Sequence, residues 1–165
     1  MRSISVLTRS LMLAGALVLA ACATEPVTGP KREPYVEPPA SAATATIKGW
    51  FESHMPWTED MGTYVAVVDE KALPHKEKAR QPDPVRLEAG DRMVTIVHAW
   101  YGPGDVPGLL ASVPVILKAV PGHTYIIKAE VRRDGFLGKS RAALIWIEDE
   151  ADGTVVTPKS LHPMR

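Results

Sequence analysis

The stretch HTYIIKAEVRR, residues 123–133, decides the fold. Every second residue in it is apolar, and most of the residues between are charged; the apolar set is Tyr125, Ile127, Ala129 and Val131. A period of two is the pattern of a β-strand with one buried and one solvated face, and it is hard to keep in a helix. We therefore expect a strand over these residues.

Segments of similar composition lie on both sides of this strand in the sequence. They are rich in Val, Ile, Thr, Tyr and Trp, the residues that suit a pleated surface. The runs cover residues 43–51, 63–70, 85–90, 92–101, 112–120, 141–149 and 154–157. Glycine, aspartate and proline mark the turns between them, at residues 88–91, 120–123, 133–135 and 151–153.

Strands at this spacing, joined by short loops, predict an all-β domain over residues 43–158. We expect an antiparallel β-sandwich of about seven strands, Ig-like or transthyretin-like, with a partly open barrel as the alternative. Residues 159–165 are expected to form a C-terminal tail.

The first 21 residues have the pattern of a targeting segment. Arg2 and Arg9 give a positive start, and SLMLAGALVLAA, residues 10–21, is an apolar run of about 12 residues, where a membrane-spanning helix needs about 20. We expect residues 1–21 to be a signal peptide that is removed from the mature protein. A retained signal-anchor helix is the alternative.

The segment from Leu19 through Ala20 and Ala21 to Cys22 resembles the lipobox of bacterial lipoproteins. This resemblance implies that Cys22 carries a diacylglyceryl group, that signal peptidase II cuts before it, and that the new amino terminus is acylated. Several acyl chains hold a protein stably at a membrane, since each buried CH₂ adds about 0.8 kcal/mol. The alternative is a secretory signal with a free cysteine.

The residue after Cys22 is Ala23, not the aspartate that in this family is associated with inner-membrane retention. The resemblance therefore implies an outer-membrane anchor with the protein facing the periplasm. Because Cys22 is the only cysteine, no disulfide can form within the chain.

Residues 22–42 are rich in proline and poor in large apolar side chains. Such a segment cannot bury enough surface to fold, and proline favours extended polyproline II. We expect a disordered tether that holds the domain up to about 60 Å from the lipid, at about 3.1 Å per residue. A proline-rich ligand for a partner groove is the alternative.

Residues 85–157 look like the carboxy-terminal half of small β-sandwich domains in bacterial envelope lipoproteins. The likeness is carried by LKAVPGHTYIIKAEV, residues 117–131, and by WIEDEADGTVV, residues 146–156. It supports the fold and brings no catalytic residues with it.

Charge and motifs limit the function. Lys plus Arg and Asp plus Glu both total 19, so the sequence lacks the basic excess of a nucleic-acid-binding protein. No serine-hydrolase elbow, zinc-protease helix, Walker loop or dinucleotide fingerprint is present. We expect a protein that is not an enzyme and needs no cofactor.

One loop has the residue types of a copper site: ESHMPWTEDMG, residues 52–62, contains His54, Met55, Trp57 and Met61. Imidazole and thioether ligands select soft Cu(I), and an indole can shield such a cation. These residue types are similar to those of periplasmic copper chaperones, although the spacing differs. The alternative is that Met and Trp fill the open end of the sandwich.

A second candidate surface is the basic loop of residues 71–84, with Lys71, Lys76, Lys78 and Arg80. It could contact anionic lipid headgroups, lipopolysaccharide or cell-wall carboxylates. The alternative is a solvated long loop.

Two histidines and one acidic cluster complete the candidates. His98 shares a face with Val94, Ile96 and Trp100, and we expect it to be hydrogen-bonded at the rim of the core. His123 follows a Pro-Gly turn. The acids of residues 148–152 lack the spacing of a calcium loop and predict a solvated hairpin tip.

Taken together, these patterns predict a lipid-anchored, periplasm-facing envelope lipoprotein whose sandwich is a non-catalytic structural or binding module. Its expected partners are the membrane, through the lipid, and an envelope protein or the cell wall. A metal-binding protein using His54, Met55 and Met61 is the first alternative. A hydrolase whose residues converge only in space, around His98 or His123, is the second.

Overall fold

The chain folds into two β-sheets, with no helix in the part that the structure describes. The structure is a computed structural model that describes residues 32–52, 60–74, 82–101, 107–134 and 140–165. The strands in these ranges are β1 (Thr44–Lys48), β2 (Trp50–Glu52), β3 (Asp60–Val68), β4 (Lys71–Ala72), β5 (Val85–Glu88), β6 (Gly90–Tyr101), β7 (Pro107–Ala119), β8 (Thr124–Asp134), β9 (Ser140–Asp149) and β10 (Ser160–Pro163). The predicted all-β class is confirmed; β2, β4 and β10 are short strands beside the longer ones.

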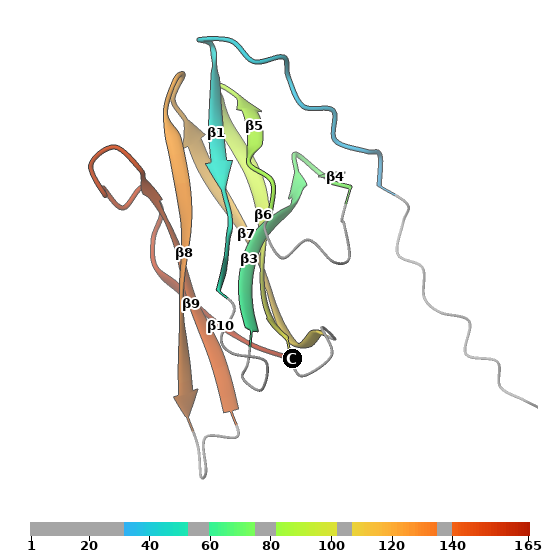
Figure 1. The fold of residues 1–165 in the computed structure, drawn as a ribbon, viewed down its shortest axis with the longest axis vertical. Coiled ribbons are helices and arrows are strands. Elements are labelled where there is room, and N and C mark those ends of the chain that lie inside the picture. The colour runs from blue at the N-terminus through green and yellow to red at the C-terminus, as the bar shows by residue number, and fades with distance from the viewer. Residues whose placement is uncertain (1–31, 53–59, 75–81, 102–106, 135–139) are drawn as a thin grey trace, which may run out of the picture. The chain divides into compact units, whose positions relative to one another are not determined.

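The two sheets pack face to face as the layers of a sandwich (Figure 1). One sheet has the order β10-β9-β8-β1-β5, and the other has the order β2-β3-β6-β7 with β4 paired to β3. Most strand pairs are antiparallel. The exception is β1 with β8, which run parallel with Ile47 opposite Tyr125.

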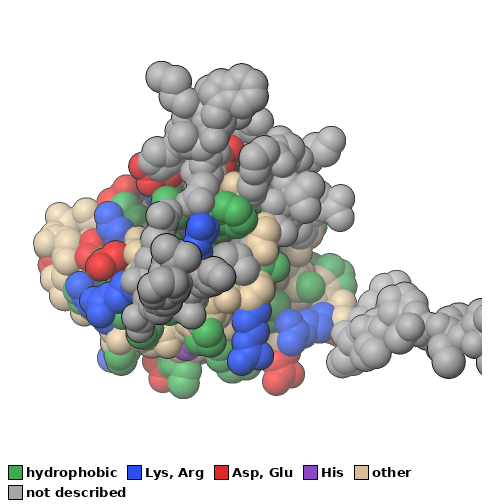
Figure 2. Space-filling model, turned by 90° about the horizontal axis from the view of Figure 1, so that it is seen from below, with side chains coloured by type: hydrophobic (Ala, Val, Ile, Leu, Met, Phe, Trp, Pro, Cys, Tyr) green, Lys and Arg blue, Asp and Glu red, His purple; other side chains and the backbone are tan. Residues whose placement is uncertain are grey.

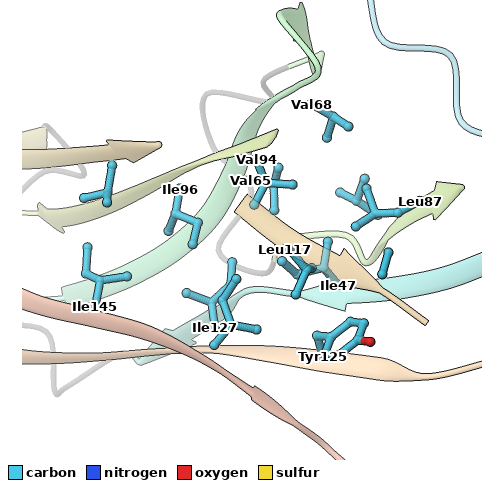
Figure 3. Packing of buried hydrophobic residues seen from close by; sticks show 14 of the residues in the cluster. Ile47, Val65, Val68, Leu87, Val94, Ile96, Leu117, Tyr125, Ile127 and Ile145 are labelled. Atoms are coloured by element: carbon cyan, nitrogen blue, oxygen red, sulfur yellow. The ribbon is translucent and has the colours of Figure 1, made fainter. Parts of the chain in front are cut away.

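The inner faces of both sheets form one hydrophobic core (Figure 3). Tyr125 and Ile127 of β8 are buried, as the alternation of residues 123–133 predicted, and face Ile96 and Leu117 of the other sheet. Each large apolar side chain buried in this way contributes about 1.5–3 kcal/mol. The predicted reversals at residues 88–91 and 120–123 are confirmed as well, since Gly90 and Gly122 both have positive φ.

A glycine lets the chain change sheets at its first strand. The run of residues 43–51 divides at Gly49, so that β1 pairs in one sheet and β2 pairs with β3 in the other. A Cβ at Gly49 would collide with the backbone carbonyl of Thr63. Only glycine therefore allows the chain to pass so close to β3.

The C-terminal residues belong to the sandwich, which corrects the expected tail at residues 159–165. β10 pairs with β9, and Met164 is buried in the core. The backbone of Arg165 exchanges two hydrogen bonds, of 2.8 and 2.9 Å, with Leu110 of β7. The run of residues 154–157 forms only a bridge, between Val155 and Glu148, because the chain there follows a tight turn.

Strand β7 lies at the edge of its sheet. Arg165 pairs with this edge at Leu110. Pro114 lies four residues further along the same side of the strand, where it has no N–H to donate to another strand.

The described part of the predicted tether, residues 32–42, begins against the sandwich. The amide of Tyr35 donates to the carbonyl of Ala72 at 2.7 Å, and the amide of Ala72 donates to the carbonyl of Glu33 at 2.8 Å. The compact unit accordingly extends over Arg32–Arg165, beginning earlier than the predicted boundary at residue 43. The contact was not predicted, because Pro34 itself has no N–H to donate. The hydrogen bonds are made instead by its neighbours, Glu33 and Tyr35.

Candidate functional site

Most of the predicted site residues lie outside the described ranges. They are Cys22, His54, Met55, Trp57, Lys76, Lys78 and Arg80. Met61 is described and lies in β3, opposite Trp100 of β6. Lys71 is also described and lies exposed in β4. Within the described ranges, no group of three or more His, Cys, Asp and Glu side chains could hold a metal ion.

Asp149 is buried, which corrects its expected place on a solvated hairpin tip. His123 Nδ1 lies 2.5 Å from Asp149 Oδ2, and the amide of Ala151 donates to Oδ1 at 3.0 Å. The hydrogen bond with His123, and then that from Ala151, hold the pKa of the Asp149 carboxyl below its ordinary value. The pair ties the β7–β8 turn to the end of β9, so both side chains have a structural task.

The other acids of this cluster each have a partner of their own. Glu148 accepts from the Trp146 indole at 2.7 Å, and Glu150 pairs with Lys48 at 2.8 Å. Asp152 accepts the amide of Thr154 at 2.9 Å. Each carboxylate therefore binds a different partner within the protein. These contacts stabilise the hairpin.

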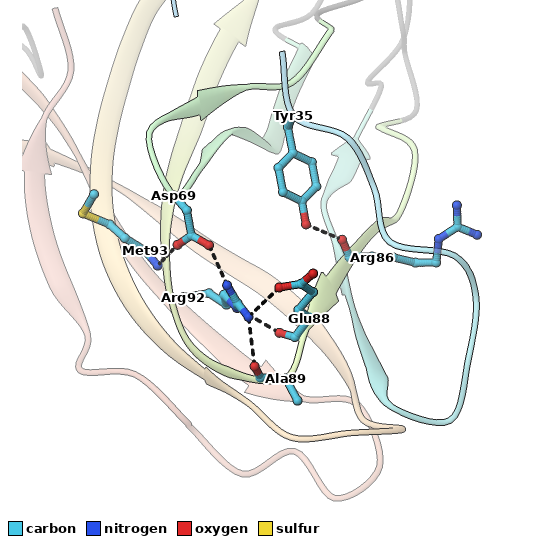
Figure 4. Close-up of polar contacts among 7 residues, drawn as sticks. All are labelled: Tyr35, Asp69, Arg86, Glu88, Ala89, Arg92 and Met93. Carbon is cyan, nitrogen blue, oxygen red and sulfur yellow. Dashed lines mark hydrogen bonds and ion pairs between the residues drawn. The ribbon is translucent and has the colours of Figure 1, made fainter. Parts of the chain in front are cut away.

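A network of hydrogen bonds joins the two sheets beside the N-terminal segment (Figure 4). Arg92 of β6 pairs with Asp69 at 3.0 Å and with Glu88 of β5 at 2.9 Å. These carboxylates, Asp69 first, raise the pKa of the Arg92 guanidinium. Asp69 also accepts the amide of Met93 at 3.0 Å.

Tyr35 crosses from one sheet to the other in the same region. Its backbone pairs with Ala72, and its phenol donates to the carbonyl of Arg86 in β5 at 2.8 Å. The Arg86 guanidinium pairs with Glu37 at 3.2 Å. Burial raises the pKa of the Tyr35 phenol, and the ring packs against the core. The N-terminal segment thus bridges β4 and β5 and braces that side of the sandwich.

The outer faces of the two sheets differ in chemistry. The outer face of the β8–β9 sheet carries ion pairs, among them Lys128 with Glu148 at 3.8 Å, and Lys159 lies 4.2 Å from the centre of the Trp146 ring. On β2, β3, β6 and β7 the outer face of the other sheet has no charged side chain between its two ends; at its edge, Arg165 lies opposite Leu110. We call it the apolar face; the register places on it Phe51, Gly62, Tyr64, Val67, Met93, Thr95, Val97, Ala99, Tyr101, Leu110, Ser112, Pro114 and Ile116.

Part of the apolar face is open to solvent. Ile116 is 71% exposed, and Met93, which lies directly opposite it, is 40% exposed, as is Leu110. Towards the other end, the rings of Phe51 and Tyr101 lie 6.0 Å apart. Burial raises the pKa of both Tyr64 and Tyr101, and the charge of Tyr101 adds to the effect on Tyr64. The tyrosines are therefore partly withdrawn from water, whereas Ile116 is not.

His98 is fully buried on the inner face of the same sheet, and this corrects its expected place at the rim. It lies opposite Thr63 of β3, and its ring centre is 6.0 Å from that of Trp50. Among the residues that the structure describes, neither ring nitrogen of His98 has a hydrogen-bond partner, and the buried Thr63 hydroxyl has none either. Burial lowers the pKa of His98 to about 4, so the imidazole is neutral at physiological pH.

Trp100 lies two residues beyond His98 on the same face, and its indole N–H is another buried donor without a partner. Its ring lies against Gly108, where a Cβ would collide with it. The guanidinium of Arg141 lies 4.6 Å from the ring centre. Unpaired buried polar groups are few in native proteins, so this part of the interior is unusual.

Seen from below, the described surface has Lys and Arg side chains as well as Asp and Glu side chains, next to hydrophobic ones (Figure 2). In the described residues, no helix is long and apolar enough to cross a membrane. Comparison with protein-family models, with curated proteins and with solved structures gives no match.

Sequence reasoning missed the apolar face, although a signal was present. In residues 94–101 and 109–117 apolar side chains occupy both sets of alternating positions. A strand with one wet face would show polar residues at one of the two sets. The sequence of these two strands therefore indicates that both of their faces are mostly apolar.

Proposed function

We propose that this chain is a lipid-anchored lipoprotein of the bacterial envelope, attached through Cys22, whose sandwich is a non-catalytic binding module. The partner is another envelope protein with an apolar, uncharged contact surface. The observation that carries this proposal is the apolar face, where Ile116 and Met93 lie opposite each other and open to solvent, and where Leu110 is also exposed, beside Arg165 at the sheet edge. Exposed apolar patches of this kind mark protein interaction sites.

The contrast between the two outer faces supports this choice of surface. Ion pairs such as Lys48 with Glu150 cover the other sheet, and their charges would have to lose water to be buried in an interface. On the apolar face this desolvation cost falls only on charges at its ends and on Arg165 at its edge, among the residues that the structure describes. Burial of its aliphatic and aromatic side chains would contribute about 25 cal/mol per Å².

The bound N-terminal segment limits the distance between Cys22 and the sandwich. Its first described residue, Arg32, follows Cys22 by ten positions, and the chain from Glu33 to Tyr35 is hydrogen-bonded to β4. Ten residues in an extended conformation span about 31 Å. If Cys22 carries the lipid, the sandwich stands within about half the distance that the full tether would allow.

A photo-crosslinking amino acid placed at Ile116 in living cells tests the partner. We expect a discrete crosslinked product that contains another envelope protein, and we expect Leu110→Glu to remove it. The matched control is the same amino acid at Ile126, on the outer face of the other sheet, which should give no such product. Equal products from both positions, or none from Ile116, would overturn the proposed surface.

The anchor is tested separately. The Cys22→Ser chain should lose fatty-acid labelling and leave the membrane fraction, while its crosslinking at Ile116 falls because the partner is no longer close. A Cys22→Ser chain that stays labelled and membrane-bound would contradict the anchor without touching the apolar face.

A further inference from the structure

The buried row of polar and aromatic side chains on the inner face goes beyond the function proposed above. Trp50, Thr63 and His98 are successive neighbours across β2, β3 and β6. Thr63 and His98 are fully buried, and in the described part of the chain both imidazole nitrogens and the hydroxyl lack partners. A buried polar group without a partner is less stable than a paired one, because it has lost its hydrogen bonds to water and gained none. An occupant that engages the imidazole would remove part of this cost.

A methionine lies diagonally across from His98 on the same face of the sheet. Met61 is two residues before Thr63 in β3, and its partner Trp100 is two residues after His98 in β6. Met61 and His98 are therefore diagonal neighbours on one face, where backbones lie about 7–8 Å apart and long side chains meet. Methionine has the length and flexibility to close such a gap. Met61 is partly exposed, so it offers a way in from the surface.

The chemistry of this set selects one class of ion. Imidazole nitrogen and thioether sulfur favour soft Cu(I), whereas Ca²⁺ and Mg²⁺ require oxygen ligands. The nearby Arg141 guanidinium repels cations, and it repels a monovalent ion half as strongly as a divalent one. The Trp50 ring, 6.0 Å from His98, offers a π face to a cation held there.

We propose that His98 and Met61 form a buried site for Cu(I) inside the end of the sandwich. The ligands are the two side chains of β6 and β3, and the indole of Trp50 shields the ion. This site differs from the loop site predicted from sequence, because it needs only Met61 of that group.

The test uses the full chain in detergent micelles, titrated anaerobically with Cu(I) against a chromogenic Cu(I) chelator of known affinity. We expect one equivalent to be retained, with quenching of tryptophan fluorescence. His98→Phe should weaken binding at least 100-fold and Met61→Leu at least tenfold. The matched controls, His162→Phe and Met93→Leu, lie away from the site and should bind as the parent does.

A measurement on the parent chain keeps the test independent of folding in the variants. Addition of Ag(I), a diamagnetic ion with similar ligand preferences, should shift the NMR signals of the His98 ring and leave those of His162 in place. Unshifted His98 signals would overturn the site. So would undiminished Cu(I) affinity in a folded His98→Phe chain, or binding that is lost only in His54→Ala and Met55→Leu.

Discussion

The phenolic hydroxyl of Tyr35 donates a hydrogen bond to the backbone carbonyl of Arg86, 2.8 Å away and 51 residues later in the chain. This bond fastens the N-terminal segment to β5, while the Tyr35 amide fastens it to β4. The N-terminal segment, whose sequence predicts a tether, thus connects the two sheets.

Tyr35→Ala should lower the free energy of unfolding by about 1.5–3 kcal/mol, because it removes a partly buried aromatic ring that packs on the core together with its hydrogen bond. Tyr35→Phe removes only the hydrogen bond and should cost about 1 kcal/mol. Urea unfolding measures both. Val36→Ala, at a side chain that is 81% exposed, is the control and should have no measurable effect. Equal stability of Tyr35→Ala and the control would mean that the segment is not bound.

Gly49→Ala should destabilise the domain by about 1–3 kcal/mol or more, since the added Cβ meets the backbone of Thr63, which cannot move without disturbing β3. Gly62→Ala is the comparison, because its Cβ would lie 3.1 Å from a carbon of the Phe51 ring, a side chain that can shift. We expect the thermal midpoint to fall further for Gly49→Ala. The reverse order would contradict the crossing between the sheets.

The pH dependence of stability should contain a contribution from Asp149. Its folded pKa lies below the unfolded value, so the stabilisation is present above the ordinary carboxyl pKa near 4 and is lost as the pH falls through the folded value. Asp149→Asn should therefore flatten the acid side of the stability curve. Urea midpoints between about pH 7 and pH 3 measure this, with Asp91→Asn as the control. An unchanged acid slope in Asp149→Asn would disprove the contribution.

A substitution in the β3–β4 turn should increase the stability of the protein. Asp69 and Glu70 have φ of 46° and 66°, which is the conformation of a two-residue hairpin turn that favours Asn and Gly. Glu70→Gly should stabilise the protein by about 1 kcal/mol, because glycine adopts this φ without strain. Glu70→Ala removes the same charge and keeps the strain, so it should gain little. A gain shared equally by both variants would assign the effect to charge.

The sequence predicted the parts of the fold that depend on alternation and turn chemistry. Tyr125 and Ile127 point into the core as expected, and Gly90 and Gly122 lie in the predicted turns. The sheet change at Gly49 could not be predicted, because the flanking residues are ordinary strand residues and the obstacle is the carbonyl of Thr63, distant in sequence.

The candidate sites were less accessible to sequence reasoning. A histidine such as His98 shows its face by alternation, but whether it has a partner depends on what Thr63 and Trp50 bring from other strands. The pairing of His123 with Asp149 likewise joins residues 26 positions apart. The apolar face was visible in the texture of β6 and β7, since neither set of alternating positions is polar there.

Pro114 affects how readily copies of this chain could pair through the edge of β7. If Cys22 carries the proposed lipid, copies of the chain share the plane of a membrane, and a bare strand edge would be a place for one copy to pair with another. A strand laid along β7 would find no donor at Pro114, two residues before the exposed Ile116 of the apolar face. With the proposed anchor, replacement of this single proline would give neighbouring copies one more N–H donor for edge-to-edge association in the membrane plane.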